Sequence, residues 1–281
     1  MKAIEILDHF KMNSSWVNWD KTVDRLLFGD SNAEVNGIAV SWMPTFSNLE
    51  EALKYKCNVF ITHEPLFAAR IDEEGNIIDS PVINDPHSRW VIGKRKLKQG
   101  DVWIKKMEWL EQHKLVVIRC HDYWDNYPDI GVHRAWAKAL GFTDPPIKIE
   151  NYYELHKIPE TTLWQLSRRI LEKIKKIGQD SIQVIGDLEK KLSSIVIGTG
   201  AATHYREMSA LGGDAILLSE DGTFLWESGQ WALDTGNPII IVNHSLSEEP
   251  GMLSLAEYLE SVFPTVPVKH IPVGCIFKSI Y

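Results

Sequence analysis

Three apolar segments of this chain each end in a histidine that is followed closely by a carboxylate. The groups are VFIT with His63 and Glu64, LVVIRC with His121 and Asp125, and IIIVN with His244 and Glu248. Imidazole and carboxylate groups are ligands with which proteins hold divalent transition metals. The whole set exceeds the four ligands of one tetrahedral ion, so it predicts two ions that activate water and hold a phosphoryl or carbonyl oxygen.

These side chains can share one site only if the strands that carry them lie together. Ligands of open α/β sheets bind beyond the carboxyl ends of the strands. If the three strands are neighbours and run in one direction, their histidines and carboxylates converge. Asp122 would point away from His121 in an extended segment, which favours Asp125 as its partner. A single polar residue at a strand end is usually a loop residue, so the hypothesis depends on the repeated arrangement.

A glycine-rich segment, GTGAAT at 198–203, is a second candidate binding element. It follows a predicted strand and precedes a predicted helix, so backbone amides around Gly198 and Gly200 could hold a phosphate or a carboxylate. The segment matches neither the GK[ST] phosphate loop nor a full GxGxxG pattern. A tight strand-to-helix turn therefore explains it equally well.

Alternating strand and helix patterns along the chain are typical of an α/β fold. We expect helices over 1–11, 47–56 (capped by Ser47), 101–113, 131–141, 160–176 and 253–262. We expect strands over 37–42, 57–62, 114–120, 193–197, 213–218, 238–243 and 272–279. Residues 145–160 are predicted to be a connection and a domain boundary. Residues 68–100 are polar and broken by prolines, which predicts a long loop or a small hairpin insertion that could cover a site.

Composition narrows the classes of protein to consider. The 281 residues, 44% of them hydrophobic, suffice for one large domain or two ordinary ones. A net charge of −8 disfavours nucleic-acid binding, which needs a basic surface. The three cysteines lack a CxxC spacing, and Cys57 and Cys120 are expected to be core residues. Without an apolar run of about 20 residues or a leader pattern, we expect no membrane association and a soluble cytoplasmic protein.

Together these motifs resemble the NIF-three-like (Ngg-interacting factor three) family, also called GTP cyclohydrolase I type 2-like or dinuclear metal centre proteins. The resemblance spans nearly the whole chain. The segments that carry it are VDRLLFGD (23–30), FITHEPLF (60–67), HDYWD (121–125), GTGAATHY (198–205), GGDAILLSE (212–220) and NHSLSEEPG (243–251).

The resemblance implies two related α/β halves with mixed sheets flanked by helices. We place these halves at 1–142 and 143–281, without the inserted middle domain of some members. It also implies two divalent ions (zinc, iron, manganese or nickel) and a ring-like homohexamer. The implied metal ligands are His63, Asp125, His244 and Glu248, with Glu64 in the place of a second histidine and His121 near the site.

Two departures from the family pattern affect the expected function. Glu64 is an anion where the family has an imidazole, and SEDGTFLWES (219–228) lacks a site histidine, leaving Glu220 and Asp221 as its nearest polar groups. We expect a metal-dependent hydrolase that acts on a nucleotide or another small anionic molecule, with Glu64 or Glu220 as general base. The alternatives are a non-catalytic metal-binding scaffold or regulatory ring protein, and a nucleotide-binding regulator that uses the glycine-rich segment.

Overall fold

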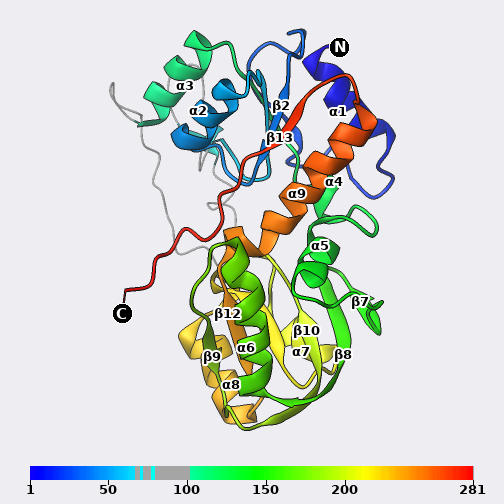
Figure 1. The fold of residues 1–281 in the computed structure, drawn as a ribbon, viewed down its shortest axis with the longest axis vertical. Coiled ribbons are helices and arrows are strands. Elements are labelled where there is room, and N and C mark those ends of the chain that lie inside the picture. Colours follow the sequence, from blue (N-terminus) through cyan, green and yellow to red (C-terminus); the bar gives the residue numbers. More distant parts are fainter. Residues whose placement is uncertain (67–69, 72–76, 80–101, 281) are drawn as a thin grey trace. The chain divides into compact units, whose positions relative to one another are not determined.

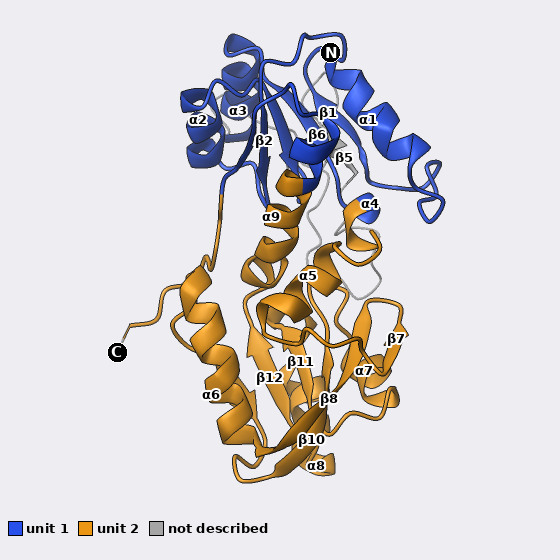
Figure 2. Cartoon of the chain, turned by 45° about the vertical axis from the view of Figure 1, so that its right-hand side comes forward, with its two compact units in different colours: residues 1–123, 258–271 blue, residues 124–257, 272–281 orange. Residues whose placement is uncertain are grey.

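A computed structural model describes residues 1–66, 70–71, 77–79 and 102–280 (Figure 1). The described chain forms two compact units (Figure 2), residues 1–123 with 258–271 and residues 124–257 with 272–281. Each unit contains a mixed sheet flanked by helices, which confirms the predicted fold class. The halves 1–142 and 143–281 remain a prediction, since the compact units have other limits and are interleaved along the chain.

The first unit is built on a five-stranded sheet in the order β1-β6-β3-β2-β13. Its strands are β1 (Arg25–Phe28), β2 (Ile38–Ser41), β3 (Val59–Thr62), β6 (Val116–Arg119) and β13 (Val268–His270). β13, β2, β3 and β6 run parallel, whereas β1 is antiparallel to β6. Every residue of β2, β3 and β6 is buried, as expected for parallel strands covered on both faces.

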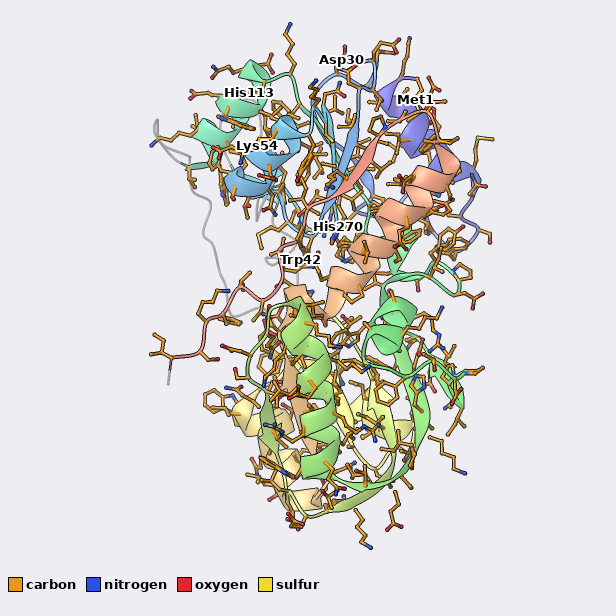
Figure 3. All side chains as sticks on the ribbon, viewed as in Figure 1. Met1, Asp30, Trp42, Lys54, His113 and His270 are labelled. Atoms are coloured by element: carbon orange, nitrogen blue, oxygen red, sulfur yellow. The ribbon has the colours of Figure 1, made fainter. Side chains whose placement is uncertain are left out.

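The helices of the first unit lie on both faces of this sheet. They are α1 (Ala3–Met12), α2 (Phe46–Lys54) and α3 (Val102–Gln112). In Figure 2, α2 and α3 lie on one side of the sheet and α1 lies on the other; Figure 3 labels Lys54 in α2 and His113 just beyond α3. The Thr45 hydroxyl accepts a hydrogen bond from the Asn48 N–H at 3.2 Å. The predicted cap at Ser47 is therefore wrong, because Thr45 already caps α2.

Most of the segment expected to form an insertion, residues 68–100, lies outside the described residues. Within it, β4 (Arg70–Ile71) and β5 (Ile77–Asp79) pair antiparallel in a small two-stranded sheet. This pairing agrees with the hairpin alternative. A covering role for the segment stays a prediction.

The second unit is built on a six-stranded sheet in the order β7-β8-β10-β11-β12-β9. Its strands are β7 (Lys148–Glu150), β8 (Tyr153–Thr162), β9 (Gln183–Ile185), β10 (Lys191–Ile197), β11 (Ile216–Ser219) and β12 (Ile239–Val242). β10, β11 and β12 run parallel, and the other strands are antiparallel to their neighbours.

The expected connection at 145–160 is wrong, because β7 and most of β8 occupy it. Buried polar residues hide this strand in the sequence. Glu154 and His156 are both buried in β8, and their side chains lie 2.8 Å apart. Arg134 adds a second ionic partner to Glu154 at 3.2 Å. These interactions compensate the burial of the charged group, so the strand needs no apolar alternation.

Helices cover both faces of the second sheet as well. They are α5 (Val132–Ala139), α6 (Leu163–Ile174), α7 (Tyr205–Ala210) and α8 (Gln230–Thr235). Trp136 of α5 and Leu166 of α6 pack in one core cluster with Ile195 of β10. Met208 of α7 packs in a separate cluster with Ile216 of β11. The strands of this unit therefore lie between two apolar layers.

The C-terminal elements differ from the sequence expectation. The helix expected over 253–262 is α9 (His244–Val262), which begins directly after β12 and contains Pro250. The strand predicted at 272–279 is wrong. Backbone N–H groups of Val273 and Gly274 each donate to the Glu249 carboxylate at 2.8 Å rather than to a neighbouring strand. The last strand is instead β13, whose His270 is labelled near Trp42 in Figure 3.

No helix among the described residues is both long and apolar enough to cross a membrane.

Candidate metal-ligand clusters

The first cluster lies at the carboxyl ends of β3 and β6 in the first unit. These strands are parallel neighbours with Thr62 opposite Arg119, so His63 and His121 leave the sheet at the same edge. The two imidazole rings stack with centroids 4.3 Å apart and planes inclined by 14°. Each ring offers a nitrogen within 4.8 Å of the other. Two of the three histidine-bearing strands therefore meet the condition that they are parallel neighbours.

The orientation of each ring in the first cluster is set by an oxygen at Nδ1. His63 is fully buried, and its Nδ1 lies 3.3 Å from the carbonyl oxygen of Cys120. His121 Nδ1 lies 3.0 Å from Asp122 Oδ1, so the expectation that Asp122 points away is wrong. Asp122 begins the short helix α4 (Asp122–Asp125), which turns its side chain back toward the ring. An Nδ1–H donated in this way leaves Nε2 as the metal-binding nitrogen.

The turn that follows β6 is held by Asp24, a residue that the sequence reasoning missed. The Asp24 carboxylate accepts the backbone N–H groups of His121, of Asp122 at 3.2 Å and of Tyr123 at 2.7 Å. Burial raises the pKa of Asp24, and these backbone hydrogen bonds oppose the shift. Asp24 thus caps the first turn of α4. The sequence feature that could have pointed to Asp24 is its position in VDRLLFGD, one of the segments that resemble the family.

Glu64 follows His63 and lies beside a buried cation. Arg119 is 7% exposed, and its Nη2 lies 3.6 Å from Glu64 Oε2. The Nε–H of the same guanidinium donates to the carbonyl oxygen of His63 at 2.9 Å. Burial lowers the pKa of Arg119, and the Glu64 carboxylate is the first of the charges that oppose this shift. Sequence reasoning treated Arg119 only as part of a strand.

The second cluster, His244 and Glu248, lies at the start of α9, just after β12 of the second sheet. β12 lies between β11 and β9 in the second unit, so the condition that all three histidine-bearing strands are neighbours in one sheet is not met for β12. His244 is the first residue of α9, and Glu248 follows one turn later on the same face. His244 Nε2 lies 3.1 Å from Glu248 Oε2, and both residues are buried. Asp125, at the end of α4, belongs to this unit and is also buried.

Asp221 fixes the His244 ring from behind. Its Oδ2 lies 2.6 Å from His244 Nδ1 and can accept the proton of that nitrogen, while Nε2 faces Glu248. Two ligand atoms on one tetrahedral zinc, each bonded at about 2.0–2.1 Å, stand about 3.3 Å apart. The separation of 3.1 Å between Nε2 and Oε2 is close to that value. The donors of this cluster therefore fit a divalent transition metal in type and spacing.

Glu220 holds the start of α9. Its carboxylate accepts the Asn243 side-chain amide and the His244 backbone N–H, each at 2.7 Å. Burial raises the pKa of Glu220, and the neighbouring Asp221 charge raises it further. The general-base role expected for Glu220 stays a prediction, and these two hydrogen bonds favour a role in positioning His244.

The glycine-rich segment lies directly against the second cluster. Gly200 has φ +72°, and a side chain there would collide with the Glu248 carboxylate and come within 3.4 Å of His244 Nε2. The Gly200 carbonyl oxygen accepts the hydroxyl of Ser219 at 2.6 Å. A side chain at Gly198 would meet Thr203 at 2.8 Å. Close packing thus explains both glycines, and anion binding by this segment stays a prediction.

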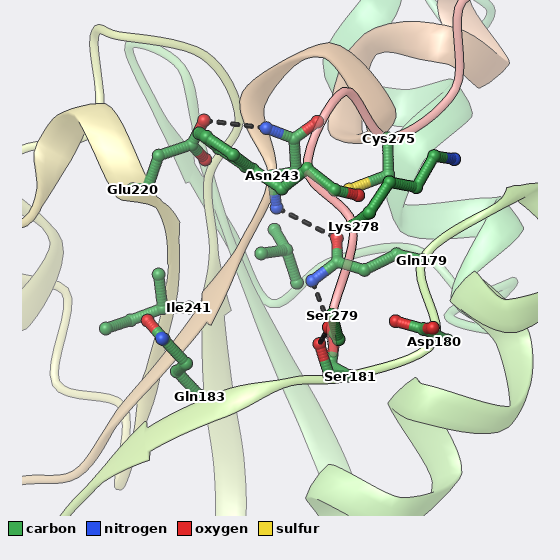
Figure 4. A pocket seen from close by; sticks show the side chains of 12 residues that line it. Gln179, Asp180, Ser181, Gln183, Glu220, Ile241, Asn243, Cys275, Lys278 and Ser279 are labelled. Atoms are coloured by element: carbon green, nitrogen blue, oxygen red, sulfur yellow. Dashed lines mark hydrogen bonds between the residues drawn. The ribbon is translucent and has the colours of Figure 1, made fainter. Parts of the chain in front are cut away.

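A pocket of about 380 Å³ in the second unit borders the same network (Figure 4). Glu220 and Asn243 form part of its lining, together with Gln179 and Cys275. Gln179 Oε1 accepts the Asn243 backbone N–H at 2.9 Å, and its Nε2 donates to the Ser181 carbonyl at 2.8 Å. Some of the polar groups that line the pocket are thus already engaged in hydrogen bonds within the chain.

Comparison with known proteins shows the family to which the chain is similar. Residues 90–275 match the family described as Duf34/NIF3 (NGG1p interacting factor 3). A GTP cyclohydrolase 1 type 2 homolog of Clostridium acetobutylicum is 22% identical, with 84% of this chain and 80% of the relative covered. A protein of the same name from Chlamydia pneumoniae is 22% identical, with 94% and 95% covered.

Solved structures show the same fold. A Bacillus cereus protein related to NIF3 aligns with a TM-score of 0.73 at 14% identity, over 100% of this chain and 99% of that chain. A hypothetical protein of Staphylococcus aureus aligns with a TM-score of 0.70 at 20% identity, over the same shares of the two chains. The family match extends over well more than half of the residues. This chain therefore belongs to the Duf34/NIF3 (NGG1p interacting factor 3) family.

Proposed function

We propose that this protein binds divalent metal ions and uses them to hydrolyse a small phosphorylated or nucleotide substrate. The observation that carries the proposal is the second cluster, in which Asp221 orients His244 and Nε2 lies 3.1 Å from Glu248 Oε2. A carboxylate behind a histidine is the usual support of a metal ligand. The stacked pair of His63 and His121 supports the proposal independently.

We assign two ions to the chain, as the resemblance implies. The proposed ligands are His63, Glu64, His121, Asp125, His244 and Glu248. Support comes from the number of donors, which exceeds what one tetrahedral ion takes. The assignment of both clusters to one dinuclear centre rests on the family resemblance. Zinc, iron, manganese and nickel all suit mixed imidazole and carboxylate ligands.

A divalent ion held by these residues supplies Lewis-acid activation of water and of a phosphoryl or carbonyl oxygen. The chain's own residues orient the ligands: Asp221 fixes the His244 tautomer, and Glu220 holds the first turn of α9. The proposed general base is whichever of Glu64 and Glu220 does not bind an ion. The name of the curated relatives, GTP cyclohydrolase 1 type 2 homolog, supports a nucleotide as the substrate class.

A scaffold function is the second candidate. The segment 219–228 supplies no histidine, and the Glu220 carboxylate is engaged by Asn243 and His244. In this alternative the ions stabilise the fold or a ring-like homohexamer and catalyse nothing. The two candidates share the metal site and differ in turnover, so one set of proteins tests both.

Metal content is the first measurement. Tag-free protein purified without chelator is analysed by elemental mass spectrometry beside H244A/E248A, and beside E257A/E260A as a control on the exposed face of α9. We expect about two equivalents in the wild type and the control and a clear loss in H244A/E248A. Less than about a tenth of an equivalent in the wild type after metal reconstitution would overturn the proposal.

Activity then separates the candidates. Protein loaded with each metal is incubated with p-nitrophenyl phosphate, bis-p-nitrophenyl phosphate and GTP, and light scattering gives the oligomeric state. Turnover that is lost in H244A/E248A supports the hydrolase. Metal binding that changes assembly or thermal stability, with no turnover of any substrate, supports the scaffold.

A further inference from the structure

Arg119 is a buried cation at the edge of the first cluster, and the proposed reaction gives it no role. It is the last residue of β6, directly before Cys120 and His121. Its side chain reaches across to the end of the neighbouring strand β3, where His63 and Glu64 follow. Burying an arginine is costly unless charge and hydrogen-bond partners compensate it. The partners that it contacts are therefore informative.

Two contacts define the orientation of the guanidinium. Its Nε–H donates to the carbonyl oxygen of His63 at 2.9 Å, which anchors the planar group against the turn. With Nε anchored, Nη2 faces Glu64 Oε2 at 3.6 Å. The rigid fork of arginine can make both contacts at once, which the single ammonium of a lysine cannot do in the same geometry.

The turn itself is held from its other side by β2. The Glu64 N–H donates to the carbonyl oxygen of Trp42 at 2.9 Å, and the His63 N–H donates to that of Ser41 at 3.3 Å. The backbone of His63 and Glu64 is thus fixed by β2, while Arg119 contacts the Glu64 side chain from β6. Arg119 adds one hydrogen bond to this main chain, at the His63 carbonyl oxygen, and is the residue of β6 that contacts the Glu64 carboxylate.

We infer that Arg119 is a positioning residue that holds the Glu64 carboxylate beside His63 and compensates its charge. This inference rests on the proposed function, because it concerns how the first cluster binds a divalent ion. Without the guanidinium, Glu64 would lose this contact and the positive charge beside its carboxylate together. Arg119 should therefore act on metal affinity through Glu64 and not through the fold.

A double-mutant cycle tests this dependence. Co²⁺ affinity, from calorimetry and from the visible absorption of the bound ion, is measured for wild type, R119M, E64Q and R119M/E64Q. We expect R119M to weaken binding by at least about tenfold in the wild type, the usual effect of losing an outer partner of a ligand. In the E64Q background, R119M should lower the Co²⁺ affinity by less than about twofold. A difference of that size is within the usual deviation from additivity of two independent mutations.

The controls separate three outcomes. R168M, which removes an exposed arginine of α6 in the second unit, should bind Co²⁺ like the wild type. Equal losses from R119M in both backgrounds would overturn the inference, because Arg119 would then act independently of Glu64. If R119M does not fold, R119K is carried through the same cycle with the same criterion. Failure of the wild type itself to bind Co²⁺ would instead overturn the proposed function.

Discussion

His244 and Asp221 lie 2.6 Å apart, from Nδ1 to Oδ2, although 23 residues separate them in the sequence. Asp221 follows β11, and His244 follows the parallel neighbour β12, so the shared sheet edge brings them together. The pair determines which nitrogen of His244 carries the proton. That choice decides whether Nε2 can bind a metal beside Glu248.

Replacing Asp221 should weaken metal binding without unfolding the protein. D221N keeps the shape of the side chain but no longer accepts the Nδ1 proton as an anion. We expect metal affinity to fall by about 10–100-fold, measured by competition with a chromogenic chelator. D234N, on the exposed surface of α8, is the matched control. An affinity for D221N equal to that of D234N would show that the tautomer is not controlled by this carboxylate.

Bound metal should raise the free energy of unfolding. A ligand at about 100 times its Kd that binds only the native state contributes about 2.7 kcal/mol. Urea unfolding at fixed protein concentration, with added metal or with chelator, measures this difference. The gain should be absent in H244A/E248A. An equal gain in that variant would place the stabilising metal somewhere else in the chain.

Gly200 should be intolerant of a side chain for a reason specific to the second cluster. G200A combines a positive φ of +72° with a collision against the Glu248 carboxylate. Gly236 has a φ of +68° with open space around the added carbon, so G236A measures the backbone strain alone. That strain costs about 1–2 kcal/mol. We expect G200A to cost more stability than G236A and also to weaken metal binding. Equal unfolding free energies and unchanged metal affinity would show that Glu248 moves aside without cost.

The cysteine thiols should be unreactive in the folded protein. Cys57, Cys120 and Cys275 are all buried, and burial raises the pKa of Cys57 from 9.0 to about 11. The thiolate is the reactive form, so a disulfide reagent at pH 8 should label the native protein slowly and the urea-unfolded protein at once. A thiol that reacts rapidly in the native protein would contradict this burial.

The raised pKa of Cys57 also makes the free energy of unfolding depend on pH. The unfolded chain releases the Cys57 proton near pH 9.0, whereas the native chain keeps it to about pH 11. The native state then binds more protons, so the free energy of unfolding should fall as the pH rises between these values. C57A should reduce that slope. An unchanged slope would assign the pH dependence to other groups.

Local patterns predicted the apolar central strands and most of the longer helices, but not the edge strands or the pairing of the strands. β2, β3, β6 and β12 are short, fully buried and mostly apolar runs, which are visible in any window of the sequence. The sheet that each strand joins depends on pairing between distant segments, which is why β12 was expected beside β3 and β6. β8 was missed because Glu154 and His156 occupy buried positions as a pair.

The candidate ligands could be named from the sequence, whereas the residues that support them could not. His244 and Glu248 follow a recognisable strand at helical spacing. Asp24 lies 97 residues from His121, and the contact between them exists only after β1 pairs with β6. Arg119 stood out only as part of the strand LVVIRC, because its contacts are with the end of the neighbouring strand β3. Supporting residues of this kind leave no periodic signal.

The position of β13 also constrains how the protein is made. Residues 268–270 complete the sheet of the first unit by pairing with residues 38–40 of β2. During translation β2 leaves the ribosome early, whereas β13 emerges only after residues 124–257 of the second unit have been made. Until then β2 remains an open edge on the nascent chain, and open edges invite pairing with other chains. Cells that produce this protein quickly should therefore depend on chaperones that shield that edge until translation ends.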